Sequence, residues 1–112
     1  MDYQTARNFL LTQGNITDSN SDTFLSRLQQ GKPPIPGQVT NILLALKVVY
    51  EGLQGSSTLD RDLVYALHLL AFESRQSYEA GRKSGVEWTP ILDEDIKRIS
   101  RTVKSIFAGV WQ

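Results

Sequence analysis

The chain has 112 residues, of which 40% are hydrophobic and 21% are charged, and both fractions are ordinary for a globular protein. Its 12 basic and 12 acidic residues give a formal net charge of zero, which argues against a protein whose main task is to hold nucleic acid. The sequence contains no cysteine, so disulfides, thiolate chemistry and cysteine-based metal centres are excluded. This length predicts a single domain, residues 1–112, with its own hydrophobic core, and the periodicity described below predicts that it is all-helical.

The first helix is predicted over about residues 3–13. Asp2 is a suitable N-cap, apolar residues recur at helical spacing, and Gly14 is a suitable stop after the helix. Residues 15–22 are rich in Ser, Asn and Asp, so we expect them to form a loop.

A short second helix is expected next, capped by Ser21 or Asp22 and ended by Gly31. The following segment, residues 32–37, contains three prolines and cannot be helical. Its PxxP spacing is that of a ligand for an aromatic groove. The simpler interpretation is a stiff spacer that sets the angle between two helices, with Ile35 packed inwards.

Two strongly buried helices are predicted in the middle of the chain. A wide apolar face predicts the third helix over about residues 38–53. The fourth helix is expected around residues 58–81, and it contains the run 63–72, in which His68 is the only strongly polar residue. Apolar residues point in every direction around this part of the helix, so we expect other helices to surround it. The run is too short to cross a bilayer, which needs about 20 apolar residues.

The last helix is expected to begin near Leu92. Its acidic first turn is followed by four basic residues: Lys97, Arg98, Arg101 and Lys104. Three of them are spaced to form one stripe, flanked by Arg98, and this basic stripe suits phosphates, an anionic membrane surface or an acidic partner. Favourable acid-before-base pairs four residues apart support the plainer interpretation of a solvated helix face.

Two tryptophans flank this helix. Trp88 stands beside Pro90 in the preceding loop, and Trp111 is the penultimate residue. Trp111 either latches over the core or belongs to a partner surface, since Trp, Tyr and Arg are common interface anchors. The candidate interaction surface therefore consists of Lys97, Arg98, Arg101, Lys104, Trp88 and Trp111.

His68 is the only histidine, so any histidine-dependent mechanism must use it. Its neighbours at helical spacing are apolar, which favours a buried histidine with a hydrogen-bonded ring. One alternative is an apolar ligand pocket formed by Tyr65, His68 and Phe72. Another is an enzyme that pairs His68 with Glu73 or a different carboxylate.

Several familiar motifs are missing from the sequence. It has no P-loop, no GxGxxG fingerprint, no HExxH motif and no EF-hand spacing. The helix pair best placed to form a helix-turn-helix presents mainly hydrocarbon, where polar side chains would be needed to contact base edges. We therefore predict no catalytic residue, no cofactor and no metal, and we do not expect nucleic acid as a partner.

Three stretches carry a resemblance to known sequences: residues 34–39 (PIPGQV), residues 65–76 (from YAL to ESRQ) and residues 105–112 (SIFAGVWQ). They resemble a family of short cyanobacterial proteins of unassigned function, over nearly the whole chain. Members of this family sometimes carry the name dethiobiotin synthetase. That activity needs a P-loop in an α/β domain, and the sequence shows neither pattern. The resemblance implies a cyanobacterial source and supplies no functional residues.

Taken together, the patterns predict an all-α fold, a compact bundle of four to five helices with a buried central helix around residues 58–81. The first residues lack the basic start and apolar run of a signal peptide, so we expect a cytoplasmic protein.

The functional prediction is a non-enzymatic protein-interaction or regulatory protein, with a homodimer as one form of that interaction. Residues 1–56 carry only four basic and four acidic residues, and such a charge-poor half favours a surface that meets a partner. Two alternatives stay open. One is a small-ligand binder with its pocket near His68, and the other is a protein that binds an anionic surface or nucleic acid through the basic stripe.

Overall fold

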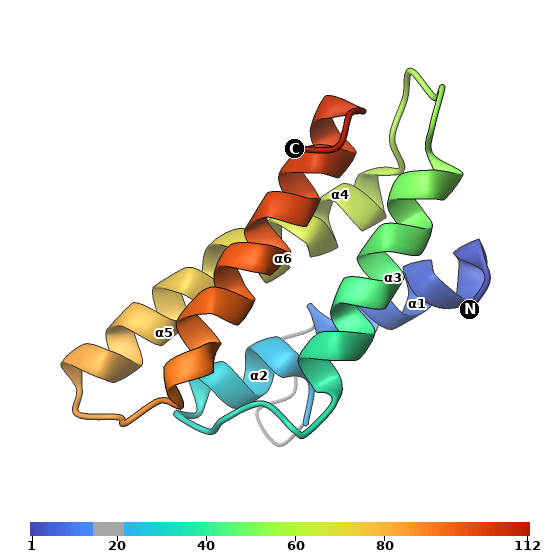
Figure 1. Cartoon of the computed structure of the whole chain (residues 1–112). Helices are drawn as coiled ribbons and strands as arrows, with labels where there is room; N and C mark the ends of the chain where they lie inside the picture. The colour runs from blue at the N-terminus through green and yellow to red at the C-terminus, as the bar shows by residue number, and fades with distance from the viewer. Residues whose placement is uncertain (15–21) are drawn as a thin grey trace.

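The computed structural model describes residues 1–14 and 22–112, and this part of the chain contains helices and connecting loops but no strand. The elements in chain order are α1 (Tyr3–Gln13), α2 (Phe24–Gln29), α3 (Gln38–Gly52), α4 (Arg61–His68), the π-helical turn η1 (Leu69–Glu73), α5 (Ser74–Lys83) and α6 (Pro90–Ala108). Because α4, η1 and α5 follow one another without a break, they form one long helix (Figure 1). The predicted all-α bundle of four to five helices is confirmed.

Helix α3 packs against α1 and α6, and the long helix covers the other side of the bundle (Figure 1). Within the long helix, α4 contacts α1, η1 contacts α6, and α5 contacts α2. The radius of gyration is 13.6 Å, close to the value of about 13 Å expected for a domain of this length. Among the described residues, no helix is both long enough and apolar enough to cross a bilayer.

Local capping explains where the first two helices begin. The carboxylate of Asp2 accepts a hydrogen bond from the backbone N–H of Thr5 at 2.8 Å, so α1 has the predicted cap. The cap of α2 is Thr23, whose hydroxyl accepts from the backbone N–H of Ser26 at 3.3 Å, and the prediction of Ser21 or Asp22 is wrong. The predicted loop over residues 15–22 falls outside the described residues except at its last position.

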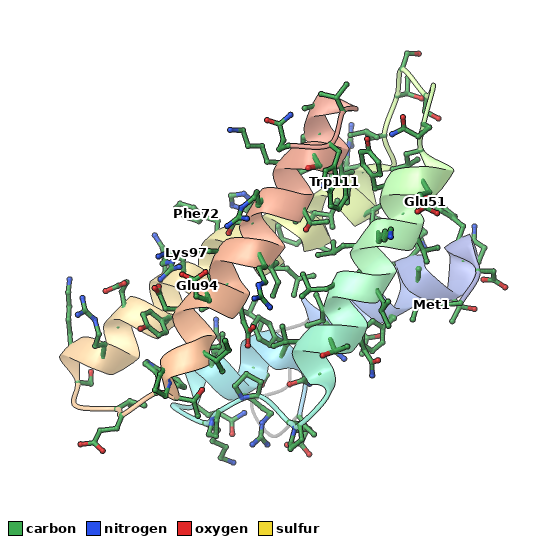
Figure 2. All side chains as sticks on the ribbon, viewed as in Figure 1. Met1, Glu51, Phe72, Glu94, Lys97 and Trp111 are labelled. Carbon is green, nitrogen blue, oxygen red and sulfur yellow. The ribbon has the colours of Figure 1, made fainter. Side chains whose placement is uncertain are left out.

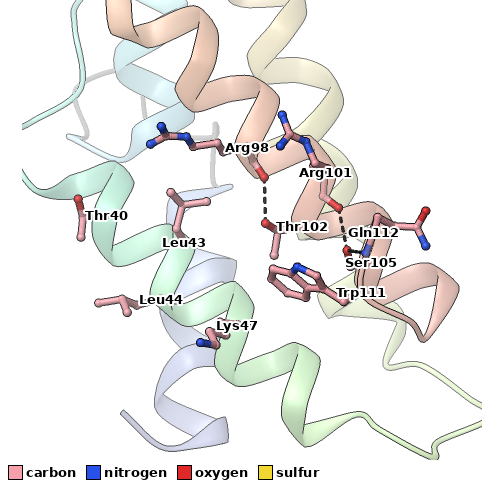
Figure 3. Close-up of a pocket in the computed structure, with 10 residues that line it drawn as sticks. All are labelled: Thr40, Leu43, Leu44, Lys47, Arg98, Arg101, Thr102, Ser105, Trp111 and Gln112. Atoms are coloured by element: carbon pink, nitrogen blue, oxygen red, sulfur yellow. Dashed lines mark hydrogen bonds between the residues drawn. The ribbon is translucent and has the colours of Figure 1, made fainter.

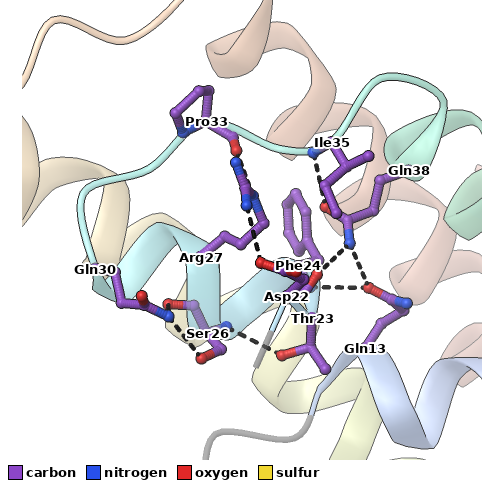
Figure 4. A network of polar contacts seen from close by, with 10 residues as sticks. All are labelled: Gln13, Asp22, Thr23, Phe24, Ser26, Arg27, Gln30, Pro33, Ile35 and Gln38. Carbon is purple, nitrogen blue, oxygen red and sulfur yellow. Dashed lines mark hydrogen bonds and ion pairs between the residues drawn. The ribbon is translucent and has the colours of Figure 1, made fainter. Parts of the chain in front are cut away.

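A buried pair of glutamines ties α1, α2 and α3 together (Figure 4). The side-chain oxygen of Gln13 accepts from the backbone N–H of Phe24 at 2.8 Å and from the amide of Gln38 at 3.1 Å. The same Gln38 amide donates to the carbonyl oxygen of Asp22 at 2.9 Å, and its side-chain oxygen accepts from the backbone N–H of Ile35 at 3.1 Å. The proline segment is thus fixed through its backbone. The Ile35 side chain is 39% exposed, so the prediction that it packs inwards is wrong.

The long helix runs over residues 61–83 and contains a π turn at its centre. The backbone N–H of Ser74 donates to the carbonyl oxygen of Leu69, five residues back, and the buried Ser74 hydroxyl donates to the carbonyl oxygen of Leu70. From α6, the Ser100 hydroxyl donates to the carbonyl oxygen of Ala71 at 3.3 Å. Where the regular α-helical hydrogen-bond pattern is interrupted, serine hydroxyls therefore donate hydrogen bonds to the backbone carbonyl oxygens.

One face of this helix is open, and the prediction that other helices surround it is wrong. Leu63, Leu67 and Leu70 are fully buried, whereas Tyr65 is 63% exposed, Phe72 is 50% exposed and His68 is also exposed. Figure 2 shows Phe72 pointing away from the bundle. We call the exposed row formed by Tyr65, His68 and Phe72 the aromatic crest.

Helix α6 begins at Pro90, two residues before the predicted start, with Pro in the first turn, where its missing N–H costs no intrahelical hydrogen bond. The helix ends at Ala108, and Gly109 follows in the left-handed conformation, with φ of 75°. Glycine adopts this conformation without the steric penalty of a Cβ, so the last residues can leave the helix axis and return towards the bundle.

Candidate functional site

A groove with a volume of about 530 Å³ lies between α3 and α6, and the C-terminal residues form part of its wall (Figure 3). Its lining combines three apolar side chains, three cations and several hydroxyl or amide groups. These are, in the same order, Leu43, Leu44 and Trp111; Lys47, Arg98 and Arg101; and Thr40, Thr102, Ser105 and Gln112. This mixture of an apolar wall and fixed positive charge makes it the best candidate for a binding site in the described part of the chain.

The two arginines come from successive turns of α6, and Lys47 comes from α3 on the other side of the groove. Figure 3 shows Arg98 extending from α6 towards α3. Among the described residues, no carboxylate lies within the 4.0 Å of an ion pair to any of these three cations. Asp95 interacts with Arg98 over a longer range. Partial burial raises the pKa of Asp95, and the charge of Arg98 offsets only part of this increase. The groove therefore carries positive charge without a neutralising partner at contact distance.

The C-terminal residues are held in place by two contacts. The backbone N–H of Gln112 donates to the Ser105 hydroxyl at 2.9 Å, and that hydroxyl donates in turn to the carbonyl oxygen of Arg101 at 3.1 Å. The Trp111 ring meets Tyr50 of α3 edge to face, with ring centroids 5.0 Å apart and an interplanar angle of 74°. Trp111 is still 56% exposed, so it presents apolar surface to the groove while remaining anchored to the bundle.

The structure divides the predicted interaction surface. Arg98, Arg101 and Trp111 come together in the groove. Lys97 instead pairs with Asp93 at 3.1 Å and with Glu94 at 3.6 Å, and Figure 2 places Lys97 beside Glu94. The hydrogen bond from Lys97, after the stronger effect of Arg75, lowers the pKa of Asp93. Lys97 is thus part of the ion pairs that connect the start of α6 to α5, as the plainer interpretation of a helix support suggested.

Lys104 and Trp88 also lie outside the groove. Lys104 is exposed and does not line it. Trp88 precedes α6 and Trp111 follows it, so a helix of 19 residues, about 28 Å long, separates the two tryptophans. Trp88 stacks on Tyr78 with ring centroids 6.0 Å apart and donates its ring N–H to the Tyr78 carbonyl oxygen at 2.9 Å. This tryptophan closes the loop between α5 and α6.

The expected burial of His68 is wrong, and Tyr65, His68 and Phe72, the residues of the predicted pocket, lie on the surface. His68 and Phe72 stack on each other at 5.1 Å between ring centroids, with an interplanar angle of 19°, on the outside of the long helix. Since Tyr65 and Phe72 are at least half exposed, the three side chains form a surface row and do not line an apolar interior.

Seven of the ten groove residues were not predicted as site residues, among them Leu43, Leu44 and Lys47 of α3. Leu44 is 53% exposed although it belongs to a strongly apolar helix. The sequence did contain one indication of this site. Leu44 is a large apolar residue outside the face of the helix that packs on the core, and it lies one turn from Lys47, the only basic residue of that helix.

No family model matches the sequence, and neither a curated protein nor a solved structure matches it. The resemblance to short cyanobacterial proteins therefore stays a prediction. In the described part of the chain, no group of three or more His, Asp or Glu side chains is arranged to hold a metal ion.

Proposed function

We propose that this protein is a non-enzymatic protein-interaction protein, and that its partner binds in the groove between α3 and α6. The observation that carries the proposal is the set of three cationic residues, Lys47, Arg98 and Arg101, that line the groove and have no carboxylate of the described residues at contact distance. Other cations of the described chain, such as Arg75 and Lys97, do pair with acidic side chains.

The apolar wall supports the same proposal. Leu44 and Trp111 are each more than half exposed, and both line the groove that the two arginines also line. Tryptophan and arginine are the residues most often found as energetic anchors of protein interfaces. An interface core that places them next to an aliphatic side chain gains both apolar burial and directed charge contacts.

Charge reversal in the groove tests this proposal. The double variant Arg98→Glu/Arg101→Glu should lose the partner, because each replacement sets a negative charge where the partner meets a positive one. Lys83→Glu/Lys104→Glu is the matched control, since both lysines are exposed and lie outside the groove. Circular dichroism of each variant checks that the helices are retained.

The measurement is quantitative cross-linking and mass spectrometry in a lysate of the organism that encodes the protein. Partners that the wild type and the control retain should be missing from the groove variant. A partner set that is the same for all three proteins, or no partner for the wild type, would contradict the proposal.

A second candidate function, self-association into a homodimer, is favoured by the aromatic crest. Tyr65 and Phe72 expose large apolar surfaces on one helix face, and the stacked His68 lies between them. Sedimentation velocity provides the test: a dimer of the wild type should become a monomer in Tyr65→Ser/Phe72→Ser. A wild type that stays monomeric at the highest concentration studied removes this candidate.

A further inference from the structure

We infer that the groove between α3 and α6 recognises a short acidic segment of a partner protein, in which two or more carboxylates flank large apolar side chains. This inference rests on the proposed function and names the chemistry of the partner. The positions of the cations, the exposure of the apolar side chains and the volume of the groove support it.

The cations are distributed over two helices. Arg98 and Arg101 are three residues apart on α6, a rise of about 4.5 Å, and Lys47 stands on α3 across the groove (Figure 3). Each guanidinium can hold one carboxylate through two parallel hydrogen bonds, whereas the lysine acts as a point charge. Because these cations stand on both sides of the groove, a chain that carries several carboxylates can pair with more of them than a lone carboxylate can.

The apolar side chains that line the groove together with these cations are largely exposed to solvent. Leu44 is 53% exposed and Trp111 is 56% exposed. A fatty acid or another anionic amphiphile binds best where protein encloses most of its surface. A half-exposed wall instead suits side chains that are attached to a larger body, because the partner itself then covers the outer face of Leu44 and Trp111.

The volume of the groove limits the length of the segment. One turn of α-helix, treated as a cylinder 10–12 Å wide and 5.4 Å high, fills about 400–600 Å³. The groove measures about 530 Å³, so it holds the side chains of about one turn, or of an extended segment of similar bulk. The part of the partner that enters the groove is therefore a short motif.

Selection from a display library of random twelve-residue peptides tests this inference without assuming a partner sequence. On the wild-type protein, the enriched peptides should combine Asp or Glu with Leu, Phe or Trp. On Arg98→Glu/Arg101→Glu the same peptides should bind about tenfold more weakly or worse, and a new selection should enrich Lys and Arg. The control Lys83→Glu/Lys104→Glu should keep the wild-type preference.

Fluorescence places the peptide in the groove. In Trp88→Phe, Trp111 is the only tryptophan, so a selected acidic peptide should shift its emission. The affinity should fall as sodium chloride is raised from about 0.05 M to about 0.5 M, because salt screens exposed charges. Decanoate is titrated in parallel as a simple anionic amphiphile.

The outcomes separate the inference from the proposed function. Enriched peptides without acidic residues, no enrichment at all, or tight binding of decanoate with the same dependence on Arg98 and Arg101 would each overturn the inference. If groove-dependent partners are still captured from a lysate in that case, the proposed function stands and only the acidic motif is wrong. If the partners captured from the lysate also do not depend on Arg98 and Arg101, both the inference and the proposed function are wrong.

Discussion

Replacing Ser74 by alanine tests how the long helix accommodates its π turn. The Ser74 backbone N–H donates to Leu69, and its hydroxyl donates to the carbonyl oxygen of Leu70. The Ser74 side chain is fully buried, so water cannot take over as donor when the hydroxyl is removed. Ser74→Ala therefore removes a hydrogen bond from the interior while preserving nearly all of the side-chain volume.

The expected loss can be worked out from these contacts. A buried polar group that loses its partner costs about 1–3 kcal/mol, and the better helix propensity of alanine offsets about 0.5 kcal/mol. The net decrease in the free energy of unfolding is then about 0.5–2.5 kcal/mol. With an unfolding entropy of about 2.1 cal/mol/K per residue, the 112 residues give about 235 cal/mol/K, so Tm should fall by about 2–11 °C.

Thermal and urea unfolding followed by circular dichroism measure this change. Ser77→Ala is the control, because Ser77 lies on the same helix, is partly exposed, and has no side-chain hydrogen bond to the described residues. Its Tm should stay the same or rise slightly. If Ser74→Ala proves as stable as Ser77→Ala, the reasoning about the π turn is refuted.

Two further predictions concern the contacts of α5 with α6 and with the loop that precedes α6. Hydrogen bonds from Arg75 and, to a smaller degree, from Lys97 lower the pKa of Asp93 in the folded protein. The stabilisation that Asp93 provides is therefore complete above its unfolded-state pKa of about 3.8. It is lost as the pH falls through the lower folded-state pKa. The urea midpoint should consequently fall between about pH 5 and pH 2 by less in Asp93→Asn than in the wild type; an equal fall would contradict the assignment. Gly81→Ala would place a Cβ 2.6 Å from the Trp88 ring, so we expect a loss of about 1–3 kcal/mol and a changed near-ultraviolet signal, and an unchanged spectrum would count against this contact.

The helix boundaries that depend on local chemistry could be predicted from the sequence. Asp2 and Gly14 bracket α1 at its observed ends, because a capping side chain and a glycine act on the residues next to them. The third helix was likewise placed within one residue of its observed end at Gly52. These signals need no knowledge of the tertiary structure.

The aromatic crest could not be predicted because apolar composition does not give the phase of a helix. In a regular α-helix the run 63–72 would present apolar groups on all sides. In the structure Leu63, Leu67 and Leu70 lie on the face that meets the core, and Tyr65, His68 and Phe72 lie on the opposite face. Because both faces are apolar, the residue types alone do not show which of them is buried.

The groove was predicted only in part for a different reason. Arg98, Arg101 and Trp111 belong to the last segment of the chain, and their common role as an interaction surface was predicted. Their neighbours Leu44 and Lys47 lie about fifty residues earlier, and only the packing of α3 on α6 brings the two groups together. Sequence spacing carries no information on that contact.

The buried pair Gln13 and Gln38 has a consequence for how the domain opens. Helix α2 has six residues, well below the roughly 12–15 that an isolated helix needs for marginal stability in water. It persists because Phe24, Leu25 and Leu28 are buried in the core and because Gln13, which Gln38 holds in turn, accepts from its first backbone N–H. The amide protons of α2 should therefore exchange with solvent at rates similar to those of α1 and of the start of α3. These three segments would then behave as one cooperative unfolding unit.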